Sequence, residues 1–173
     1  SDSSRAARGD AILAALAGGV ALNLADAQAV GRAAAEMLDR ARAAGVTPRG
    51  LLLQRMAEKG LEIVIGGRRD PVFGPLVTVG LGGVFVELIK DVATAPAPVT
   101  PAQALRLIGR LRHADALEGV RGLPPVDRAA LARAVAQVSE LLANHPEIAE
   151  LDVNPLICRG ESITAVDGLI LRA

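Results

Sequence analysis

The chain is organised around an eight-residue stretch near its C-terminus, Glu150-Leu151-Asp152-Val153-Asn154-Pro155-Leu156-Ile157. Apolar and polar residues alternate through most of it, as in a β-strand with one buried face. Period 2 places Glu150, Asp152 and Asn154 together on the other face. Two carboxylates and an amide are costly there if they are dry and unpaired. The stretch therefore predicts a buried strand whose polar side chains border a cleft or solvent.

A second strand, Ile163-Thr164-Ala165-Val166-Asp167, follows after the turn Arg159-Gly160-Glu161. This spacing favours a hairpin, which would bring Asp167 near Asn154. One carboxylate and one amide oxygen are a suitable protein contribution to Mg²⁺, which keeps waters and takes further ligands from substrate phosphate. The alternative is a hairpin whose outer face is simply solvated. Spacing alone leaves both interpretations open.

Composition excludes several classes of protein. The 173 residues are 51% apolar but only 1% aromatic, so an Ala, Val, Leu and Ile core is expected and base stacking on aromatic side chains is not. Lys plus Arg and Asp plus Glu both number 19, which leaves no basic surplus for a nucleic-acid backbone. The single Cys158 fits a reducing cytoplasm, and no apolar run approaches a membrane span. We expect a cytoplasmic protein with neither a nucleic acid nor a membrane as partner.

The order of predicted elements indicates an α+β fold. Helices are expected after the N-caps Asp26, Thr100 and Asp127, the first with an apolar stripe of Val30, Ala34, Met37, Leu38 and Ala41. A short helix is expected at 11–17 and a Pro/Ala linker at 95–98. Besides the two C-terminal strands, strands are expected at 20–24, 51–56, 61–65, 76–79 and 84–89, with a loop at 66–75. Short connections between strands favour a mostly antiparallel sheet with helices on one face.

Three further features suit chemistry but also have ordinary explanations. Glu62 lies in an apolar strand, where an acid needs a partner or a wet cleft, unless the strand simply faces solvent. The pair Arg68-Arg69 suits phosphate or carboxylate recognition, although solvated loop charges are the commoner case. Gly80-Leu81-Gly82-Gly83 lets a phosphate approach the backbone, but a hairpin turn explains it equally well.

Three motifs taken together are more specific. Residues 60–75, Gly80-Leu81-Gly82-Gly83 with Glu87, and residues 150–156 closely resemble the ATP-grasp domain of NDP-forming acyl-CoA synthetases. These are relatives of the succinyl-CoA synthetase β subunit and of the ATP-grasp part of some bacterial protein acetyltransferases. The resemblance runs from about Gly18 to the C-terminus. It predicts a partial ATP-grasp domain over 18–173, preceded by a poorly matched segment, 1–17.

The resemblance implies an acid–CoA ligase chemistry in which acyl-CoA, NDP and phosphate are interconverted with acid, CoA and NTP. In that family a phosphohistidine on a CoA-binding subunit or domain carries the phosphoryl group, so we expect such a partner, an oligomer, and Mg²⁺ and ATP or ADP as cofactors. The matched positions are the metal-binding pair Asn154 and Asp167, Gln54 facing the adenine, and Glu62, Arg69, Gly82 and Gly83 at the nucleotide.

The chain also departs from the family pattern. The family has an upstream lobe with a phosphate-binding Lys, and a His-Lys-(Ser/Thr)-Asp segment before the Gly-Gly-Val matched by Gly18-Gly19-Val20. Here Ile12 to Ala17 contains no His, Lys or acid, and no Lys precedes Lys59. We therefore expect no turnover by this chain alone. It is a portion of a synthetase that works with other polypeptide, or a degenerate module for protein interaction, or a nucleotide sensor that binds without catalysis.

Overall fold

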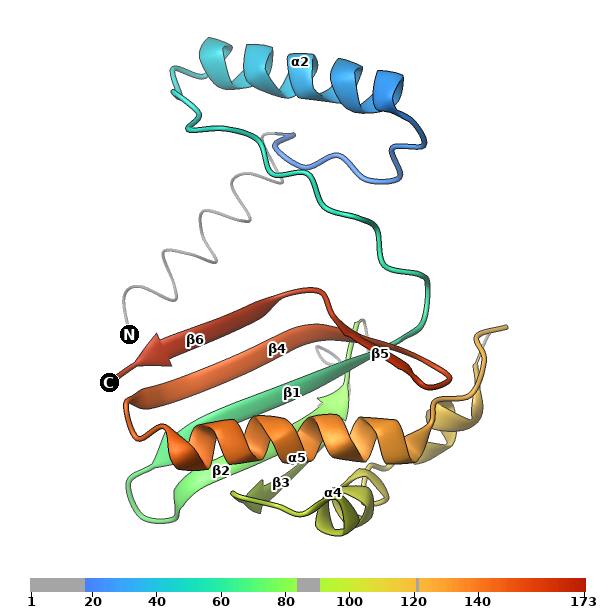
Figure 1. The fold of residues 1–173 in the computed structure, drawn as a ribbon, viewed down its shortest axis with the longest axis vertical. Helices are drawn as coiled ribbons and strands as arrows, with labels where there is room; N and C mark the ends of the chain where they lie inside the picture. Colours follow the sequence, from blue (N-terminus) through green and yellow to red (C-terminus); the bar gives the residue numbers. More distant parts are fainter. Residues whose placement is uncertain (1–17, 84–90, 121) are drawn as a thin grey trace. The chain divides into compact units, whose positions relative to one another are not determined.

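The computed structural model describes residues 18–83, 91–120 and 122–173 (Figure 1). The chain divides into two compact units, residues 1–56 and 57–173. The helix predicted at 11–17, the strand predicted at 84–89 and Glu87 lie outside the described residues. None of the described helices is both long enough and apolar enough to cross a bilayer.

The first unit contains helix α2, Ala27–Ala43, which begins where the sequence predicts. The Asp26 carboxylate accepts a hydrogen bond from the backbone N–H of Ala29 at 2.7 Å and caps the helix. The predicted apolar stripe is half-buried, and no residue of α2 is fully buried. At the other end, the Arg40 guanidinium donates to the Gly18 carbonyl at 2.9 Å.

The strands predicted at 20–24 and 51–56 are wrong, and so is the pairing of the second with 61–65. Both stretches lack strand structure, and neither pairs with any strand in the described parts of the chain. Leu22, Leu52 and Leu53 consequently remain 62%, 84% and 70% exposed. An apolar alternating pattern becomes a strand only when a neighbouring strand takes up its backbone hydrogen bonds.

The second unit is built on a six-stranded sheet in which every pairing is antiparallel (Figure 1). The strand order is β3-β2-β1-β4-β5, and β6 also pairs with β4. The strands are β1 Leu61–Asp70, β2 Gly74–Leu81, β3 Val92–Pro96, β4 Ile148–Arg159, β5 Ser162–Ala165 and β6 Gly168–Arg172. The predicted antiparallel sheet and the hairpin after residue 159 are confirmed.

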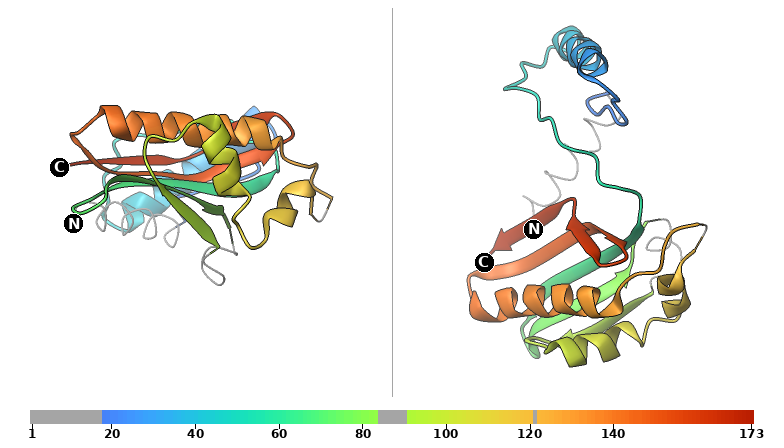
Figure 2. Two further views of the ribbon diagram at one scale, coloured as in Figure 1. Left: turned by 90° about the horizontal axis from the view of Figure 1, so that it is seen from below. Right: turned by 45° about the vertical axis from the view of Figure 1, so that its right-hand side comes forward.

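Two helices cover one face of this sheet (Figure 2). Helix α4, Pro101–Ile108, begins with a capping box between Thr100 and Gln103, and helix α5, Arg128–Asn144, begins at Asp127, whose carboxylate accepts from two backbone N–H groups. A short 3₁₀ helix, η1 Ala114–Glu118, lies between them in sequence. Both predicted caps and the one-sided arrangement of helices are confirmed.

The odd-numbered residues of β1 point to the helices. Leu61, Ile63 and Ile65 are buried in the main core with residues of α4 and α5, among them Leu107, Ile108, Leu131 and Val135. At Gly67 a Cβ atom would lie 3.1 Å from Cδ2 of Leu142, so the helix packs directly on the strand backbone there. The even-numbered residues of β1 therefore belong to the sheet face without helices.

A β-bulge interrupts β4 within the stretch 150–157. One residue of β1, Val64, faces two residues of β4, Asn154 and Pro155. The extra residue changes which positions face the core, so the buried side chains are Leu151 before the bulge and Leu156 after it. The predicted period of 2 holds up to the bulge and is then shifted by one residue.

Two segments that the sequence predicts to be irregular form strands in the structure. Residues 66–70 were expected in a loop, but β1 continues to Asp70 because β2 and β4 pair with it from both sides. The predicted linker at 95–98 overlaps β3, whose Pro96 lies on an edge strand where its missing N–H is tolerated. Strand β6 was not predicted. At 66–70 and at 95–96, hydrogen bonds to neighbouring strands outweigh the local preference of glycine or proline for a turn.

Cys158 lies on the helix face of β4 and is fully buried. Burial raises the pKa of its thiol from 9.0 to about 12, which leaves almost no thiolate at neutral pH. We expect Ellman's reagent to label the native protein far more slowly than the protein in denaturant, with the labelling rate following unfolding as urea is increased. Rapid stoichiometric labelling without denaturant would contradict the buried position of this strand.

Asp91 connects the start of β3 to the turn after α4. Its carboxylate is 4% exposed and accepts from the backbone N–H groups of Arg112 and His113, both at 2.8 Å, with His113 Nδ1 at 3.2 Å. Burial by itself would raise the pKa of Asp91, but these donors outweigh it and the pKa is lowered. The charged form therefore stabilises the fold.

An Asp91→Asn variant is expected to lose about 2 kcal/mol of unfolding free energy at neutral pH, because a buried donor loses its acceptor. The pKa of Asp91 is lower in the folded state than its ordinary value of 3.8. The stability that Asp91 contributes is therefore fully present above pH 3.8 and is lost as the pH falls through the folded-state pKa. Urea titrations at several pH values should show the two proteins converging in acid. The exposed Asp115→Asn is the control, with little effect at any pH.

Candidate functional site

The sheet face without helices carries most of the predicted site. On β1 it presents Glu62, Val64, Gly66 and Arg68, since the alternate residues face the core. Pairing places Gly66 opposite Asp152 on β4 and Thr78 on β2, and Arg68 opposite Glu150. A shallow open hollow of about 170 Å³ lies here, lined by Gly66, Gly67, Arg68, Thr78, Glu150, Leu151 and Asp152. Within the described residues of the second unit, this face carries polar side chains and is not covered by α4 or α5.

Glu62, Gly82 and Gly83 meet at one end of this face. The Gly82 N–H donates to the Glu62 carbonyl at 2.6 Å. A Cβ on Gly82 would lie 2.8 Å from the Glu62 carbonyl carbon, and one on Gly83 would lie 2.9 Å from Glu62 Oε2. Gly83 also has a φ of +65°, which disfavours other residues. The two glycines therefore allow the loop after β2 to wrap closely around an exposed carboxylate.

Asn154 and Asp167 are brought together by the backbone. The Asn154 N–H donates to the Asp167 carbonyl at 3.2 Å, and the neighbouring Val166 N–H donates to the Pro155 carbonyl at 3.0 Å. Both side chains are exposed. Asp167 Oδ1 also accepts from the Gly168 N–H at 2.8 Å, which orients the carboxylate. The bulge places Asn154 opposite Val64, two residues along β1 from Glu62.

This donor set fits Mg²⁺ rather than a metal that needs many protein ligands. Within residues 18–83, 91–120 and 122–173, no three His, Cys, Asp or Glu side chains come together as a metal cluster. One exposed carboxylate and one exposed amide, on residues joined by a backbone hydrogen bond, would leave most coordination positions for water and phosphate oxygens, as Mg²⁺ prefers. That Asn154 and Asp167 hold the ion stays a prediction.

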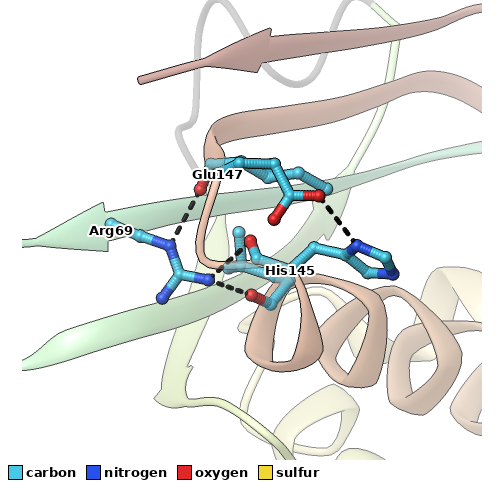
Figure 3. Close-up of polar contacts among 5 residues, drawn as sticks. Arg69, His145 and Glu147 are labelled. Carbon is cyan, nitrogen blue, oxygen red and sulfur yellow. Dashed lines mark hydrogen bonds and ion pairs between the residues drawn. The ribbon is translucent and has the colours of Figure 1, made fainter.

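Arg69 lies elsewhere (Figure 3). Its guanidinium donates to the carbonyl oxygens of Leu142, of His145 at 2.8 Å and of Ile148 at 2.9 Å. These groups end α5 and start β4, so Arg69 satisfies carbonyls that the helix leaves unpaired and places a cation at the negative end of its dipole. The contacts give it a structural role on the helix side, apart from Glu62, Gly82 and Gly83. The prediction that Arg69 binds the nucleotide gains no support from these hydrogen bonds and stays a prediction.

Gln54 lies in the first unit, in an exposed segment outside any helix or strand. Its predicted place on a strand is wrong, while its contact with adenine stays untested. Thr78 and the alignment of Arg68 with Glu150 on the open face are not predicted from the sequence. The signal was present, because residues spaced by two along β1 and β2 share a face once their register is known.

Comparison with known proteins identifies the class. An ATP-grasp domain model matches residues 10–171, so the chain belongs to the ATP-grasp family. The beta subunit of the ADP-forming acetate–CoA ligase I of Pyrococcus furiosus is 43% identical over 122 residues, which are 70% of this chain and 53% of that subunit. A trans-feruloyl-CoA synthase from an unknown prokaryotic organism is 37% identical over 159 residues, 90% of this chain and 22% of that protein.

A solved structure of the same class agrees in fold. The dinucleotide-forming acetyl-coenzyme A synthetase 1 of Ca. Korarchaeum cryptofilum matches with a TM-score of 0.81 and 36% identity over 92% of this chain and 70% of that one. That protein is in complex with coenzyme A and Mg-AMPPCP, with a phosphohistidine segment pointing towards the nucleotide binding site. The present chain spans about half the length of the Pyrococcus subunit and about a fifth of the feruloyl-CoA synthase.

Proposed function

We propose that this chain is the nucleotide- and Mg²⁺-binding portion of an NDP-forming acyl-CoA synthetase. The observation that carries the proposal is the backbone hydrogen bond between Asn154 and Asp167, two residues with exposed oxygen-bearing side chains within the ATP-grasp match. Residues 18–173 form the partial ATP-grasp domain in this proposal. A cytoplasmic location, expected from the single Cys158, belongs to it as well.

The residues have distinct tasks in this proposal. Asn154 and Asp167 hold Mg²⁺, which when bound neutralises charge on phosphate oxygens. Glu62, with Gly82 and Gly83 folded around it, binds the nucleotide, since the two residues without side chains leave the Glu62 carboxylate exposed. The catalytic contribution of this chain is then positioning and electrostatics, as in other phosphoryl transfers.

Transfer of the phosphoryl group and binding of the acyl-CoA require residues of another subunit or domain. No Lys precedes Lys59, and Ile12 to Ala17 offers neither a His nor an acid. We therefore propose a CoA-binding subunit or domain that carries a phosphohistidine, assembled with this chain in an oligomer. The resulting reaction interconverts acyl-CoA, NDP and phosphate with acid, CoA and NTP.

Calorimetric titration with ADP and ATP tests this function. Binding that requires Mg²⁺, with or without a CoA-binding chain present, is the expected result. Absence of Mg²⁺-dependent binding in both conditions would contradict it. Acyl-CoA formation should appear only when the CoA-binding chain is added.

The second candidate is a degenerate ATP-grasp module that serves protein interaction. It is favoured by the segment Ala14 to Ala17, which contains no His, Lys or acid, and by the exposed leucines of the first unit, Leu22, Leu52 and Leu53. It predicts a stable complex on light scattering and no nucleotide binding. Nucleotide binding that never leads to turnover, even with the CoA-binding chain, would instead indicate a sensor.

A further inference from the structure

The hollow on the open sheet face lies next to the proposed nucleotide site and in line with it along β1. Glu62, Val64, Gly66 and Arg68 follow one another on this face, with about 7 Å between successive members. The bulge places Asn154 opposite Val64. Since Mg²⁺ binds phosphate oxygens, a nucleotide that contacts Glu62 and a metal ion at Asn154 has its phosphate chain next to the hollow.

The middle of the hollow has room for a ligand directly over the strand backbone. Chain neighbours apart, Thr78 is the only described residue that would come within 4 Å of a Cβ placed on Gly66, and its own Cβ would lie 4.0 Å away. The hydroxyl oxygens of Thr78 and Thr94 lie 2.9 Å apart, so one hydroxyl donates to the other. The second hydroxyl hydrogen can then be donated to an acceptor such as a phosphate oxygen.

Arg68 is the cation that borders the hollow. Of the described residues that line it, Arg68 alone has a positive charge, and it lies opposite the exposed carboxylate Glu150. Carboxylates on this face, such as Glu62 and Glu150, repel a polyanionic phosphate chain unless cations offset their charge. In the proposed function Mg²⁺ provides positive charge at the level of Asn154. Arg68 provides it at the far side of the hollow.

The guanidinium of Arg68 is exposed and weakly held. It is 69% exposed, and its ion pair with Asp70 spans 3.9 Å, so this pair restrains a long side chain very little. The neighbouring Arg69 differs, because its guanidinium already donates to three carbonyl oxygens on the helix side. A guanidinium binds phosphate oxygens through paired hydrogen bonds. These contacts favour Arg68 over Arg69 for phosphate recognition.

We infer that the hollow receives the terminal phosphate of a bound nucleoside triphosphate and that Arg68 contacts this phosphate. The inference rests on the proposed function, which requires the nucleotide and Mg²⁺. Arg68 lies four residues along β1 from the position opposite Asn154, which corresponds to about 13 Å. It therefore contacts the end of the phosphate chain, where its charge distinguishes a triphosphate from a diphosphate and stabilises the phosphoryl group that is transferred.

Isothermal titration of the full chain with Mg-ATP and with Mg-ADP tests the inference. Arg68→Ala is expected to bind Mg-ATP about 30-fold more weakly than the unmodified chain does, and Mg-ADP less than about 3-fold more weakly. Arg68→Lys, which keeps the charge and loses the planar fork, should recover part of the loss. Arg106→Ala, which removes another exposed arginine from α4, is the matched control and should bind both nucleotides as before.

A Glu150→Gln variant tests the same contact with the opposite sign. Removal of the carboxylate opposite Arg68 should tighten Mg-ATP binding about 3-fold, because a negative charge near the terminal phosphate is lost. The affinity for Mg-ADP should change less. Weaker Mg-ATP binding by this variant would contradict a phosphate in the hollow.

The outcomes separate this inference from the proposed function. Equal Mg-ATP affinity of Arg68→Ala and the unmodified chain would overturn the inference and leave the proposed function intact. So would an equal loss of affinity for Mg-ATP and Mg-ADP, because a variant that is merely less stable does not change the ratio of the two. Absence of Mg²⁺-dependent nucleotide binding by the unmodified chain, with and without the CoA-binding chain, would overturn both.

Discussion

An Asp167→Ala variant is expected to bind ADP or ATP with Mg²⁺ about 100-fold more weakly than the unmodified chain, or worse. Loss of residues that only orient a metal ligand already costs 10- to 100-fold in affinity, and here the ligand itself is removed. Asn154→Ala should lose less, because a neutral amide oxygen contributes less than a carboxylate to a divalent ion. Isothermal titration at several Mg²⁺ concentrations measures both effects.

The expected loss is specific to Mg²⁺. Asp167→Asn retains the size of the side chain and should recover little affinity, since charge and not shape attracts the ion. Glu161→Ala, which removes another exposed carboxylate from the turn between β4 and β5, is the matched control and should bind as before. If Asp167→Ala and Glu161→Ala behave alike, the metal assignment is wrong.

Replacing Arg69 with Ala is expected to lower the unfolding free energy by about 3 kcal/mol. Three carbonyl oxygens at the junction of α5 and β4 lose a charged donor, and hydrogen bonds to charged groups contribute more than neutral ones. Lys at this position should recover only part of the loss, because an ammonium cannot reproduce the planar fork of a guanidinium. Urea unfolding followed by circular dichroism measures the change.

Arg68→Ala provides the matched control from the same strand. Its side chain is 69% exposed on the open face, and its ion pair with Asp70 spans 3.9 Å. Its removal should change stability by less than about 0.5 kcal/mol. Under native conditions Arg69→Ala should still bind nucleotide. An Arg69→Ala protein of normal stability that fails to bind nucleotide would support the resemblance over the structural role.

Local signals in the sequence predicted the helices well. Asp26, Thr100 and Asp127 each provide an acceptor to N–H groups within a few residues, so their effect needs no distant partner. The hairpin that follows β4 was also predictable, because its two strands are close in the chain. The nearness of Asn154 and Asp167 was predictable for the same reason, since the two residues belong to this hairpin region.

The strands that depend on distant neighbours were predicted less well. Gly66 and Gly67 suggest a loop, but β2 and β4 hold them in the sheet from both sides. Residues 51–56 have a strand pattern and no strand partner in the described parts of the chain. Backbone hydrogen bonds between distant segments decided both cases, and no window of local sequence contains them.

By itself the sequence determined the α+β class, the helix starts, the ATP-grasp resemblance and the oxygen ligands proposed for Mg²⁺. Only the tertiary structure assigned the two neighbouring arginines to opposite faces of β1, with Arg69 at the end of α5 and Arg68 beside the open hollow. The physical reason is the strict alternation of side chains along a strand. The role of each residue then depends on the strand register and on the sheet face that the helices cover. Both are set by contacts between segments far apart in the chain.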